Sequence, residues 1–411
     1  MRILLIHQYF LDTNEGGGSR WNEMTRIWSE KGHEIEVIAG MVHYAKGEKS
    51  DKYKGKFYCK EHLSPNVIVN RTHVSEAYNS NFIGRLWAYF SFVFSSIWAG
   101  IFKVKGEFDL IVVTSPPLFV GITAYILSKI KAVPFVFEIR DLWPESAIDT
   151  GVLQNKAIIK FAYWFEKFIY SKAKLINVLT PAFKEKLIDD KKVLPNKIIF
   201  IPNAADFSLS ADLLRNFDIE EFKKLHHLEN KFIITYVGAH GVANHLIQIL
   251  QTAQRLSDTS VLFLLIGDGM QKKELLAYKA ENKIENVIFI NSVSKQEVFK
   301  YILASDMGTS VLKKNDTFKT VYSNKTFDYM ACKKPILMAI DGVSRDLVEQ
   351  AKAGIFVEPE NPTDFETKIR YYLKNKEIIM SQGENGYKFA KRNFDREVLA
   401  NQFIRILNEN V

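Results

Sequence analysis

The sequence predicts an α/β protein made of two doubly wound, parallel-sheet domains that face each other across a cleft. Short apolar runs rich in β-branched residues alternate with amphipathic stretches of helical period. Such near-continuous apolar strands are typical of parallel sheets covered by helices on both faces. The chain has 411 residues, whereas a single core stops growing at about 250–300 residues, so two domains are expected.

The predicted strands fall into two groups. Those of the first half are Arg2–Gln8, Glu34–Gly40, Asp109–Thr114, Pro134–Ile139, Leu175–Thr180 and Ile198–Pro202. After a polar stretch the alternation restarts, with strands at Phe232–Val237, Val261–Ile266, Val287–Ile290, Gly308–Leu312 and Pro335–Ile340. This restart indicates a second domain of the same class.

The hinge is expected just after the segment 201–206, where Pro202 and Asn203 end a strand and redirect the backbone. We therefore expect domains at residues 1–206 and 207–392. Residues 393–411 contain an amphipathic helical pattern, Asp395–Asn408, and are expected to pack back across the hinge. Ligands of such sheets bind outside the carboxyl ends of the strands.

Composition narrows the possible partners. Lys and Arg outnumber Asp and Glu by 55 to 47, giving a net charge of +8, which favours anionic ligands. The excess is spread along the chain without a recognisable nucleic-acid module, so nucleic acid is not expected. Cys59 and Cys332 lie far apart and predict neither a disulfide nor a zinc site. They and the strand-like start, residues 1–7, favour a cytoplasmic protein.

A glycine cluster follows the first predicted strand. Gly16, Gly17 and Gly18 precede a helical stretch from Arg20 to Lys31. Glycines at a helix N-terminus let backbone N–H groups approach an anion closely, so phosphate binding is expected. The alternative is an ordinary surface turn, because the spacing matches neither the dinucleotide fingerprint nor the P-loop.

Three charged residues follow the strand that ends at Ile139. Arg140, Asp141 and Glu145 lie in a loop that also holds Trp143. Charges placed this deep in an α/β sheet are costly unless they bind something. They predict a surface for the acceptor and the donor sugar, and the alternative is an Arg–Asp pair that only fixes the loop.

In the second half, two predicted strands are each followed by a turn that contains glycine. The first contains Gly238, His240 and Gly241, and the second contains Gly267, Asp268 and Gly269. Backbone donors of the first turn are expected to meet phosphate, and the second is expected to form a wall beside the base. The alternatives are a simple tight turn and an N-cap role for Asp268.

The start of one apolar helix carries the most informative pattern. Asn324 and Asp328 lie four residues apart and share a face, with Lys325 one step around. A lysine at a helix N-terminus opposes the macrodipole and suggests a compensating anion such as a diphosphate. A carboxylate one turn later is suited to ribose hydroxyls. The alternative is a solvated first turn.

The run Leu86–Phe102 is uncharged and rich in aromatic residues. It is at the lower limit of about 17–25 residues for a membrane span. Its Trp, Tyr and Ser content favours a helix lying in the headgroup boundary of a membrane. A helix buried against the first domain is the alternative.

Taken together, these segments resemble the retaining family-4 glycosyltransferases, and more narrowly the bacterial surface-polysaccharide enzymes that include fucosamine-type transferases. The resemblance covers almost the whole chain. The segments that carry it are residues 114–121 (TSPPLFVG), 140–146 (RDLWPES), 201–203 (IPN), 267–269 (GDG) and 324–331 (NKTFDYMA).

The resemblance implies a GT-B fold with an acceptor-binding first domain and a nucleotide-sugar-binding second domain. It implies a nucleotide-diphosphate sugar as the donor substrate, no cofactor, no obligatory metal, and attack on the face from which the diphosphate leaves. Lys325 would contact the diphosphate, Asp328 the ribose, the glycines of residues 16–18 and 238–241 the phosphates, and Asp141 the sugar or acceptor. With Arg140 and Glu145, Asp141 and Lys325 are the candidate catalytic residues.

The chain departs from the family pattern at several positions. The family commonly has an acid eight positions before the ribose carboxylate, where this chain has Thr320, and a Glu where it has Asp328. Ala239 and Asn244 replace the usual Arg and Lys after the glycine turn. Stabilisation of the leaving group must then depend more on Lys325 and on backbone amides.

The expected function is transfer of a sugar from a UDP-sugar to an undecaprenyl-diphosphate-linked saccharide in capsule or O-antigen synthesis, with an N-acetylated deoxyhexosamine as the candidate sugar. The protein would work at the cytoplasmic face of the plasma membrane, touching it through the Leu86–Phe102 region. Two alternatives remain: a GT-B nucleotide-sugar epimerase, which needs acid–base carboxylates but no acceptor, and a catalytically silent nucleotide-binding scaffold.

Overall fold

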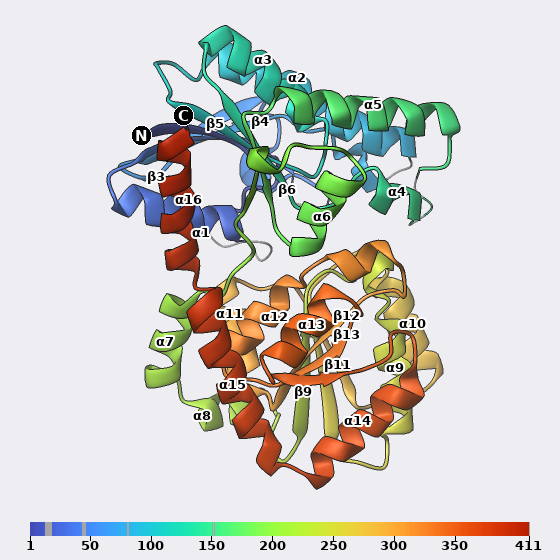
Figure 1. The fold of residues 1–411 in the computed structure, drawn as a ribbon. Helices are drawn as coiled ribbons and strands as arrows, with labels where there is room; N and C mark the ends of the chain where they lie inside the picture. The colour runs from blue at the N-terminus through green and yellow to red at the C-terminus, as the bar shows by residue number, and fades with distance from the viewer. Residues whose placement is uncertain (13–18, 43–46, 80–81, 150, 152, 411) are drawn as a thin grey trace. The chain divides into compact units, whose positions relative to one another are not determined.

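The computed structural model describes residues 1–12, 19–42, 47–79, 82–149, 151 and 153–410. The chain divides into two compact units (Figure 1). The first comprises Met1–Leu11, Ser19–Pro202 and Glu397–Val411, and the second comprises mainly Asn203–Arg396. Their sheets are parallel except for one antiparallel edge pair, so the predicted fold class is confirmed.

The first unit contains an eight-stranded sheet of order β3-β4-β2-β1-β5-β6-β7-β8. Its strands are β1 (Arg2–Ile6), β2 (Glu34–Gly40), β3 (Tyr58–Ser64), β4 (Val67–Thr72), β5 (Leu110–Thr114), β6 (Phe135–Ile139), β7 (Leu175–Val178) and β8 (Ile198–Phe200). Its helices are α1 (Arg20–Glu30), α2 (Phe82–Phe102), α3 (Val120–Lys131), α4 (Glu145–Asp149), α5 (Lys156–Lys172), α6 (Pro181–Asp189) and α16 (Arg396–Asn410).

Helices cover both faces of this sheet. The helices α2, α3 and α5 lie on one face, and α1 and α16 lie on the other (Figure 1). The C-terminal helix packs on α1 through aromatic rings, with Phe403 5.7 Å from Trp28 between ring centroids. The indole N–H of Trp28 also donates to the carbonyl of Ala400 at 2.9 Å. Residues from Glu397 onward therefore belong to the first unit.

The second unit contains a six-stranded sheet of order β11-β10-β9-β12-β13-β14. Its strands are β9 (Phe232–Val237), β10 (Val261–Ile266), β11 (Val287–Ile290), β12 (Met307–Val311), β13 (Ile336–Ala339) and β14 (Gly354–Phe356). Its helices are α7 (Phe207–Asn216), α8 (Ile219–Leu225), α9 (Ile247–Arg255), α10 (Lys272–Glu281), α11 (Lys295–Ala304), α12 (Asn324–Ala331), α13 (Val343–Gln350), α14 (Pro362–Lys374) and α15 (Glu377–Asn393).

Alternate residues of these strands enter two separate cores. Ile233 packs with α11, α12 and α15 on one face, and Ile234 packs with α9, α10 and α14 on the other. This two-sided burial is the reason that the strands read as continuous apolar runs. In both sheets the strand order reverses beside the first strand of the unit, between β1 and β5 and between β9 and β12.

The units divide at Pro202 and Arg396 rather than at the expected positions 206 and 392. The difference has a local cause, because Ala205 is hydrogen-bonded on both sides to the end of the second unit. Its N–H donates to Phe394 O at 2.8 Å, and its carbonyl accepts from Arg396 N at 3.0 Å. Asp206 then caps α7 by accepting from Leu209 N.

Three strands, β3, β4 and β14, were not predicted. β3 is the edge strand of the first sheet and pairs antiparallel with β4, and β14 is an edge strand of the second sheet. The run Leu86–Phe102 lies within α2, whose side chains Ala88, Phe92 and Ala99 are buried. Within the described part of the chain, no helix is both long enough and apolar enough to span a bilayer.

The first unit is organised around a buried carboxylate, that of Glu138 on β6. Three side chains donate hydrogen bonds to it: Arg20 Nη2 at 2.9 Å, Trp21 Nε1 at 3.0 Å and Asn177 Nδ2 at 2.8 Å. The hydroxyl of Thr114 adds a fourth donor at 3.1 Å. Arg20 and Glu138 are both almost fully buried, so each charge depends on this pairing.

We expect Glu138→Gln to lower the free energy of unfolding of the first unit by about 3–5 kcal/mol, because the Arg20 guanidinium would stay buried without its anion. All six tryptophans lie in residues 21–164, so tryptophan emission during urea unfolding follows this unit. The control is Glu34→Gln, whose side chain is 66% exposed beside Arg2; it should cost less than about 1 kcal/mol. Equal effects of the two changes would contradict the prediction.

Candidate functional site

The N-terminus of α12 places Lys325 in a desolvated position. Its amine donates to the hydroxyl of Ser323 at 3.3 Å and lies 4.8 Å from the ring centre of Tyr236. Burial lowers the pKa of Lys325 to about 8, although the charge of Asp328 opposes the shift. The side chain of Asn324, at the first position of the helix, is exposed. An anion here would restore the charged state of the amine.

Asp328, one turn along α12, is held by a lysine that the sequence did not identify. Lys295 Nζ lies 3.8 Å from a carboxylate oxygen of Asp328 and 3.8 Å from one of Asp206. Both carboxylates are mostly buried, at 22% and 12% exposure. Lys295 therefore links the carboxylate predicted for ribose to the start of α7.

Tyr329 fixes α12 to the point where the strand order reverses. Its hydroxyl accepts from Val237 N at 3.2 Å and lies 2.9 Å from Thr235 O and 3.1 Å from Thr309 O. It thus bridges β9 and β12 where their pairing ends after Thr235. Gly308 makes room for the ring, since a Cβ there would lie 2.3 Å from it.

The glycine turns after β9 and β10 pack directly against each other. A Cβ on Gly267 would lie 1.9 Å from Gly238 O, so neither turn tolerates a side chain at that contact. Gly238 N donates to Ile266 O at 3.0 Å, and His240 N donates to Asp268 O at 2.9 Å. These two N–H groups therefore already have backbone partners within the protein. Gly238 also borders Lys325, with 3.3 Å from its ideal Cβ position to Lys325 Cε.

His240 is buried between aromatic rings in this pair of turns. Its ring lies 5.7 Å from Phe289 and 6.2 Å from Tyr236 between centroids. Neither ring nitrogen has a hydrogen-bond partner among the described residues. Burial and, to a lesser extent, the charge of Lys272 lower the pKa of His240 to about 4, although the charge of Asp268 opposes the shift. The imidazole is therefore neutral at physiological pH.

Asp268 ties neighbouring loops together. One carboxylate oxygen contacts Lys272 Nζ at 2.7 Å and the other accepts from Ser292 N at 2.8 Å. Burial alone would raise its pKa, but these hydrogen bonds outweigh burial and lower it. Asp268 is not the N-cap of α10, because Gln271 occupies that position. Gly269 packs on His240 O, and Gly241 accepts from Asn244 N.

In the first unit, Asp141 lies in the loop after β6, and Glu145 is the first residue of α4. Asp141 accepts from the Ser146 hydroxyl at 2.8 Å; burial raises its pKa against that hydrogen bond. Glu145 is bound at 2.7 Å by Lys191, which also holds the buried Glu166 at 2.6 Å. One carboxylate oxygen of Glu145 is therefore occupied, which favours a structural role for this residue.

His7 is a candidate that was missed in the sequence. It directly follows β1, at the edge where the strand order of the first sheet reverses, and it is buried. Burial lowers its pKa well below the ordinary value, and the charges of Arg140 and Arg71 lower it further. His7 and Arg140 therefore belong to one electrostatic group. The available signal was a histidine directly after a buried strand.

The remaining predicted positions are placed as follows. Gly16, Gly17 and Gly18 lie outside the described residues. Thr320 donates to Thr317 O at 2.6 Å and so closes its own turn. Ala239 accepts from the Tyr236 hydroxyl at 2.9 Å. Among the described residues, no three His, Cys, Asp or Glu side chains gather as a metal site.

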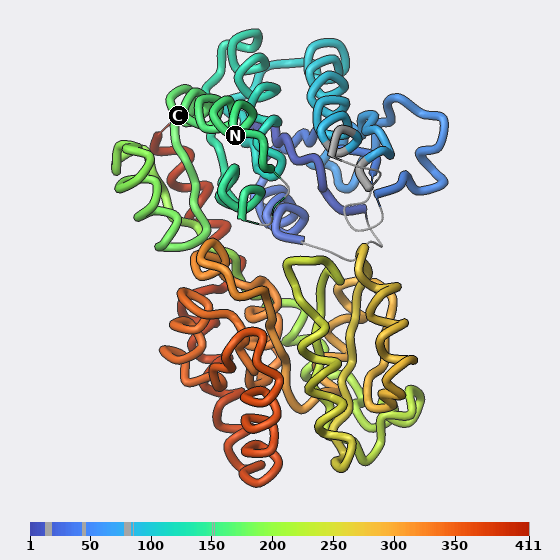
Figure 2. Tube along the Cα trace, turned by 90° about the vertical axis from the view of Figure 1, so that its right-hand side faces the viewer, coloured from blue at the N-terminus to red at the C-terminus, as the bar shows by residue number. Residues whose placement is uncertain are grey.

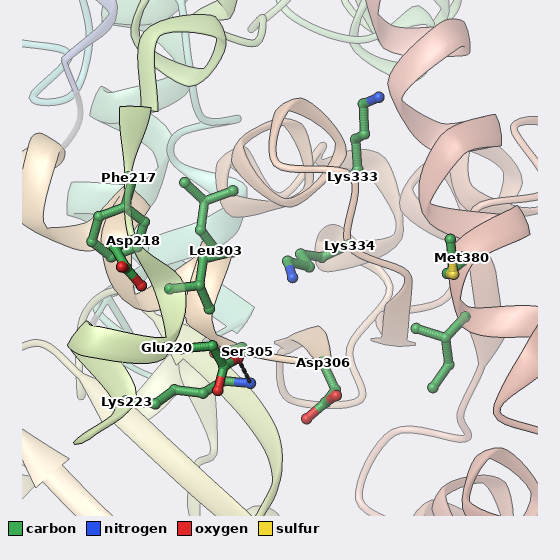
Figure 3. A pocket seen from close by; sticks show the side chains of 12 residues that line it. Phe217, Asp218, Glu220, Lys223, Leu303, Ser305, Asp306, Lys333, Lys334 and Met380 are labelled. Atoms are coloured by element: carbon green, nitrogen blue, oxygen red, sulfur yellow. Dashed lines mark ion pairs between the residues drawn. The ribbon is translucent and has the colours of Figure 1, made fainter. Parts of the chain in front are cut away.

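A cavity of about 560 Å³ lies at the opposite edge of the second sheet, beside Ser305 and Asp306 before β12 (Figure 3). Lys223 and Lys334 also line it. The cavity contains none of the predicted site residues. The residues predicted to bind the nucleotide lie instead around the carboxyl ends of β9 and β12, where ligands of open parallel sheets bind.

Comparison with known proteins gives consistent matches. The model described as "Glycosyl transferase 4-like domain" matches residues 15–204, and "Glycosyl transferases group 1" matches residues 217–389. The chain is 22% identical to the putative colanic acid biosynthesis glycosyl transferase WcaI of Escherichia coli, over 98% of this chain and 99% of the relative.

Solved structures show the same fold. Sucrose-phosphate synthase of Thermosynechococcus elongatus superposes with a TM-score of 0.75 at 15% identity, covering 99% of this chain and 98% of that one. HepE of Anabaena, solved in complex with UDP-glucose, gives 0.72 at 15% identity over the whole of both chains. At these identities the likeness establishes the architecture of the two units.

We expect Tyr329→Phe to lower the stability of the second unit by about 1–3 kcal/mol, because Val237 N–H would lose its buried partner. Calorimetry of the full chain measures the change, and the tryptophan emission of the first unit should not shift. Tyr371→Phe is the matched control, since Tyr371 is 47% exposed. An unchanged second unit in Tyr329→Phe would show that its hydroxyl does not hold α12.

Proposed function

Since the chain belongs to the group 1 glycosyltransferases, within the retaining GT4 family and with the GT-B fold, we propose that it uses a UDP-sugar. The sugar favoured by the resemblance to fucosamine-type transferases is an N-acetylated deoxyhexosamine. The acceptor is an undecaprenyl-diphosphate-linked saccharide of a capsule or O-antigen type polysaccharide. The name of WcaI and the UDP-glucose complex of HepE support this proposal.

The main observation in support of this donor site is the desolvated amine of Lys325 beside Gly238. An amine whose pKa is lowered by burial gains most from an arriving anion, because the anion restores its charge. Lys325 would hold the diphosphate and stabilise the charge that develops when it leaves. Asp328, fixed by Lys295, would accept hydrogen bonds from the ribose hydroxyls.

The reaction proceeds with retention. The acceptor hydroxyl oxygen forms a bond to the anomeric carbon as the bond from that carbon to the diphosphate oxygen breaks on the same face. The hydroxyl proton passes to an oxygen of the departing diphosphate. In this proposal the ammonium of Lys325 supplies the positive charge at the leaving group, without an obligatory metal.

The first unit would bind the acceptor. Asp141, with its raised pKa, and Arg140 are suited to hydrogen-bond sugar hydroxyls after β6. The proposed location is the cytoplasmic face of the membrane. Three aromatic side chains of α2 remain available for peripheral contact there: Trp87, Phe94 and Phe102 are 55%, 62% and 57% exposed.

We expect UDP and UDP-sugars to stabilise the second unit selectively against GDP and dTDP compounds, by about 2.7 kcal/mol at 100 times the dissociation constant. Asp328→Asn should weaken UDP binding by about 10–100-fold, since hydrogen bonds to charged groups contribute about 1.5–3 kcal/mol. The matched control is Glu281→Gln at the far end of α10, an exposed carboxylate. Equal UDP affinity in Asp328→Asn and Glu281→Gln would remove the proposed ribose contact.

UDP affinity should also depend on pH through Lys325. With a pKa of about 8, the free amine is charged at pH 7 and mostly neutral at pH 9, so binding at pH 9 requires proton uptake. The dissociation constant should rise by about tenfold from pH 7 to pH 9. Lys325→Arg keeps its charge and should remove this slope in calorimetric titrations. The same slope in the Arg variant would assign the titration to another group.

A further inference from the structure

The outer side of α3 and α5 carries a continuous row of aromatic rings. On α5, the ring centroids of Phe161 and Trp164 lie 5.7 Å apart, and those of Trp164 and Phe168 lie 5.9 Å apart. Phe168 in turn lies 5.1 Å from Tyr125 of α3. The spacing of three and four residues places the α5 rings on one side of that helix, so the row continues from one helix to the next.

Two of these four rings are exposed, and the other two, Phe168 and Tyr125, are half-buried. Phe161 is 49% exposed and Trp164 is 60% exposed, whereas Phe165 and Ile169 on the other side of α5 are buried. Both views place α3 and α5 on the outer side of the first unit (Figures 1 and 2). Contiguous exposed apolar surface of this kind marks an interaction site.

The exposed charged residues of α3 and α5 are lysines, whereas Glu145 and Asp149 of α4 lie close enough to affect Tyr163 of α5. The exposed Lys160 and Lys167 flank the row on α5, and Lys172 lies 5.7 Å from the centre of the Phe168 ring. The two helices contain a single acidic residue, Glu166, which is buried and paired with Lys191 at 2.6 Å. We call the surface formed by Tyr125, Lys160, Phe161, Trp164, Lys167 and Phe168 the α3–α5 face.

We propose that the α3–α5 face binds a bilayer containing acidic phospholipid. Amphipathic aromatic rings settle at the headgroup level, and lysines beside them are attracted to anionic lipid. A protein partner fits less well, because lysine is depleted in protein interfaces. The inference deepens the proposed function and rests on its lipid-linked acceptor, but it assigns the contact to a surface separate from α2.

The test is binding of the full chain to vesicles of phosphatidylcholine, alone or mixed with phosphatidylglycerol. Binding is expected only to the mixed vesicles. It should weaken between about 0.1 M and 1 M salt, as the screening length falls from about 10 Å to about 3 Å. At about fivefold per lysine, Lys160→Gln with Lys167→Gln should reduce affinity by about 25-fold. The matched control, Lys374→Gln with Lys376→Gln, removes two exposed charges from the second unit and should leave affinity unchanged.

Three results would overturn the inference: equal binding to both vesicle types, equal loss in the control pair, or self-association abolished by Trp164→Ser without vesicle binding. The last would assign the face to a second copy of the chain. Stabilisation by UDP, measured in the same preparations, separates the two proposals. If UDP stabilises the protein but vesicles do not bind, only the lipid inference is wrong. If vesicles bind but UDP does not stabilise the protein, only the proposed UDP-sugar donor is wrong.

Discussion

The first unit depends on one buried carboxylate, that of Glu138. Removing such a charge from water costs several kcal/mol unless every lone pair is satisfied, and here Arg20, Trp21, Thr114 and Asn177 satisfy it. The donors come from α1, β5 and β7, so one carboxylate fixes a helix against three adjacent strands. Arg20 also donates to Ile201 O at 2.8 Å, which holds the end of the unit. The loop with Asp141 begins two residues after Glu138, so its start is anchored by the hydrogen bonds of that carboxylate.

The turns of the second unit are held in place by different interactions. Its nucleotide-side turns are fixed by backbone hydrogen bonds and by steric fit, since Gly267 has no space for a Cβ against Gly238 O. Tyr329 then holds α12 where β9 and β12 part. Lys325 takes no part in the Asp268–Lys272 ion pair of these turns, so in the proposed function its charge can meet the diphosphate. The burial that positions Lys325 is also what makes its ionisation sensitive to binding.

Local sequence signals identified most of the fold and part of the site. Apolar runs revealed the central strands, and the residues that open α12 were found because their spacing is local. β14 was missed because it has only three residues, none of them buried. β3 and β4 were missed because no side chain of the edge strand β3 is buried, and Arg71 and Asn70 interrupt β4 with polar groups. Their partners, such as Glu36 for Asn70 at 3.0 Å, are distant in sequence. The role of Glu138 was hidden for the same reason, since its donors lie up to 118 residues away.

The departure at Thr320 fits the electrostatics of the donor side. Thr320 closes its own turn through Thr317 O and adds no negative charge, so Asp328 is the charged neighbour that opposes the lowered pKa of Lys325. A further carboxylate near the amine would hold it charged and would compete with an incoming diphosphate. With threonine at position 320, less negative charge compensates the Lys325 amine before an anion binds. The interaction of Lys325 with the anion can then contribute more to binding. In the proposed function, the positive charge of Lys325 would then contribute mainly in the complex, where the leaving diphosphate develops its charge.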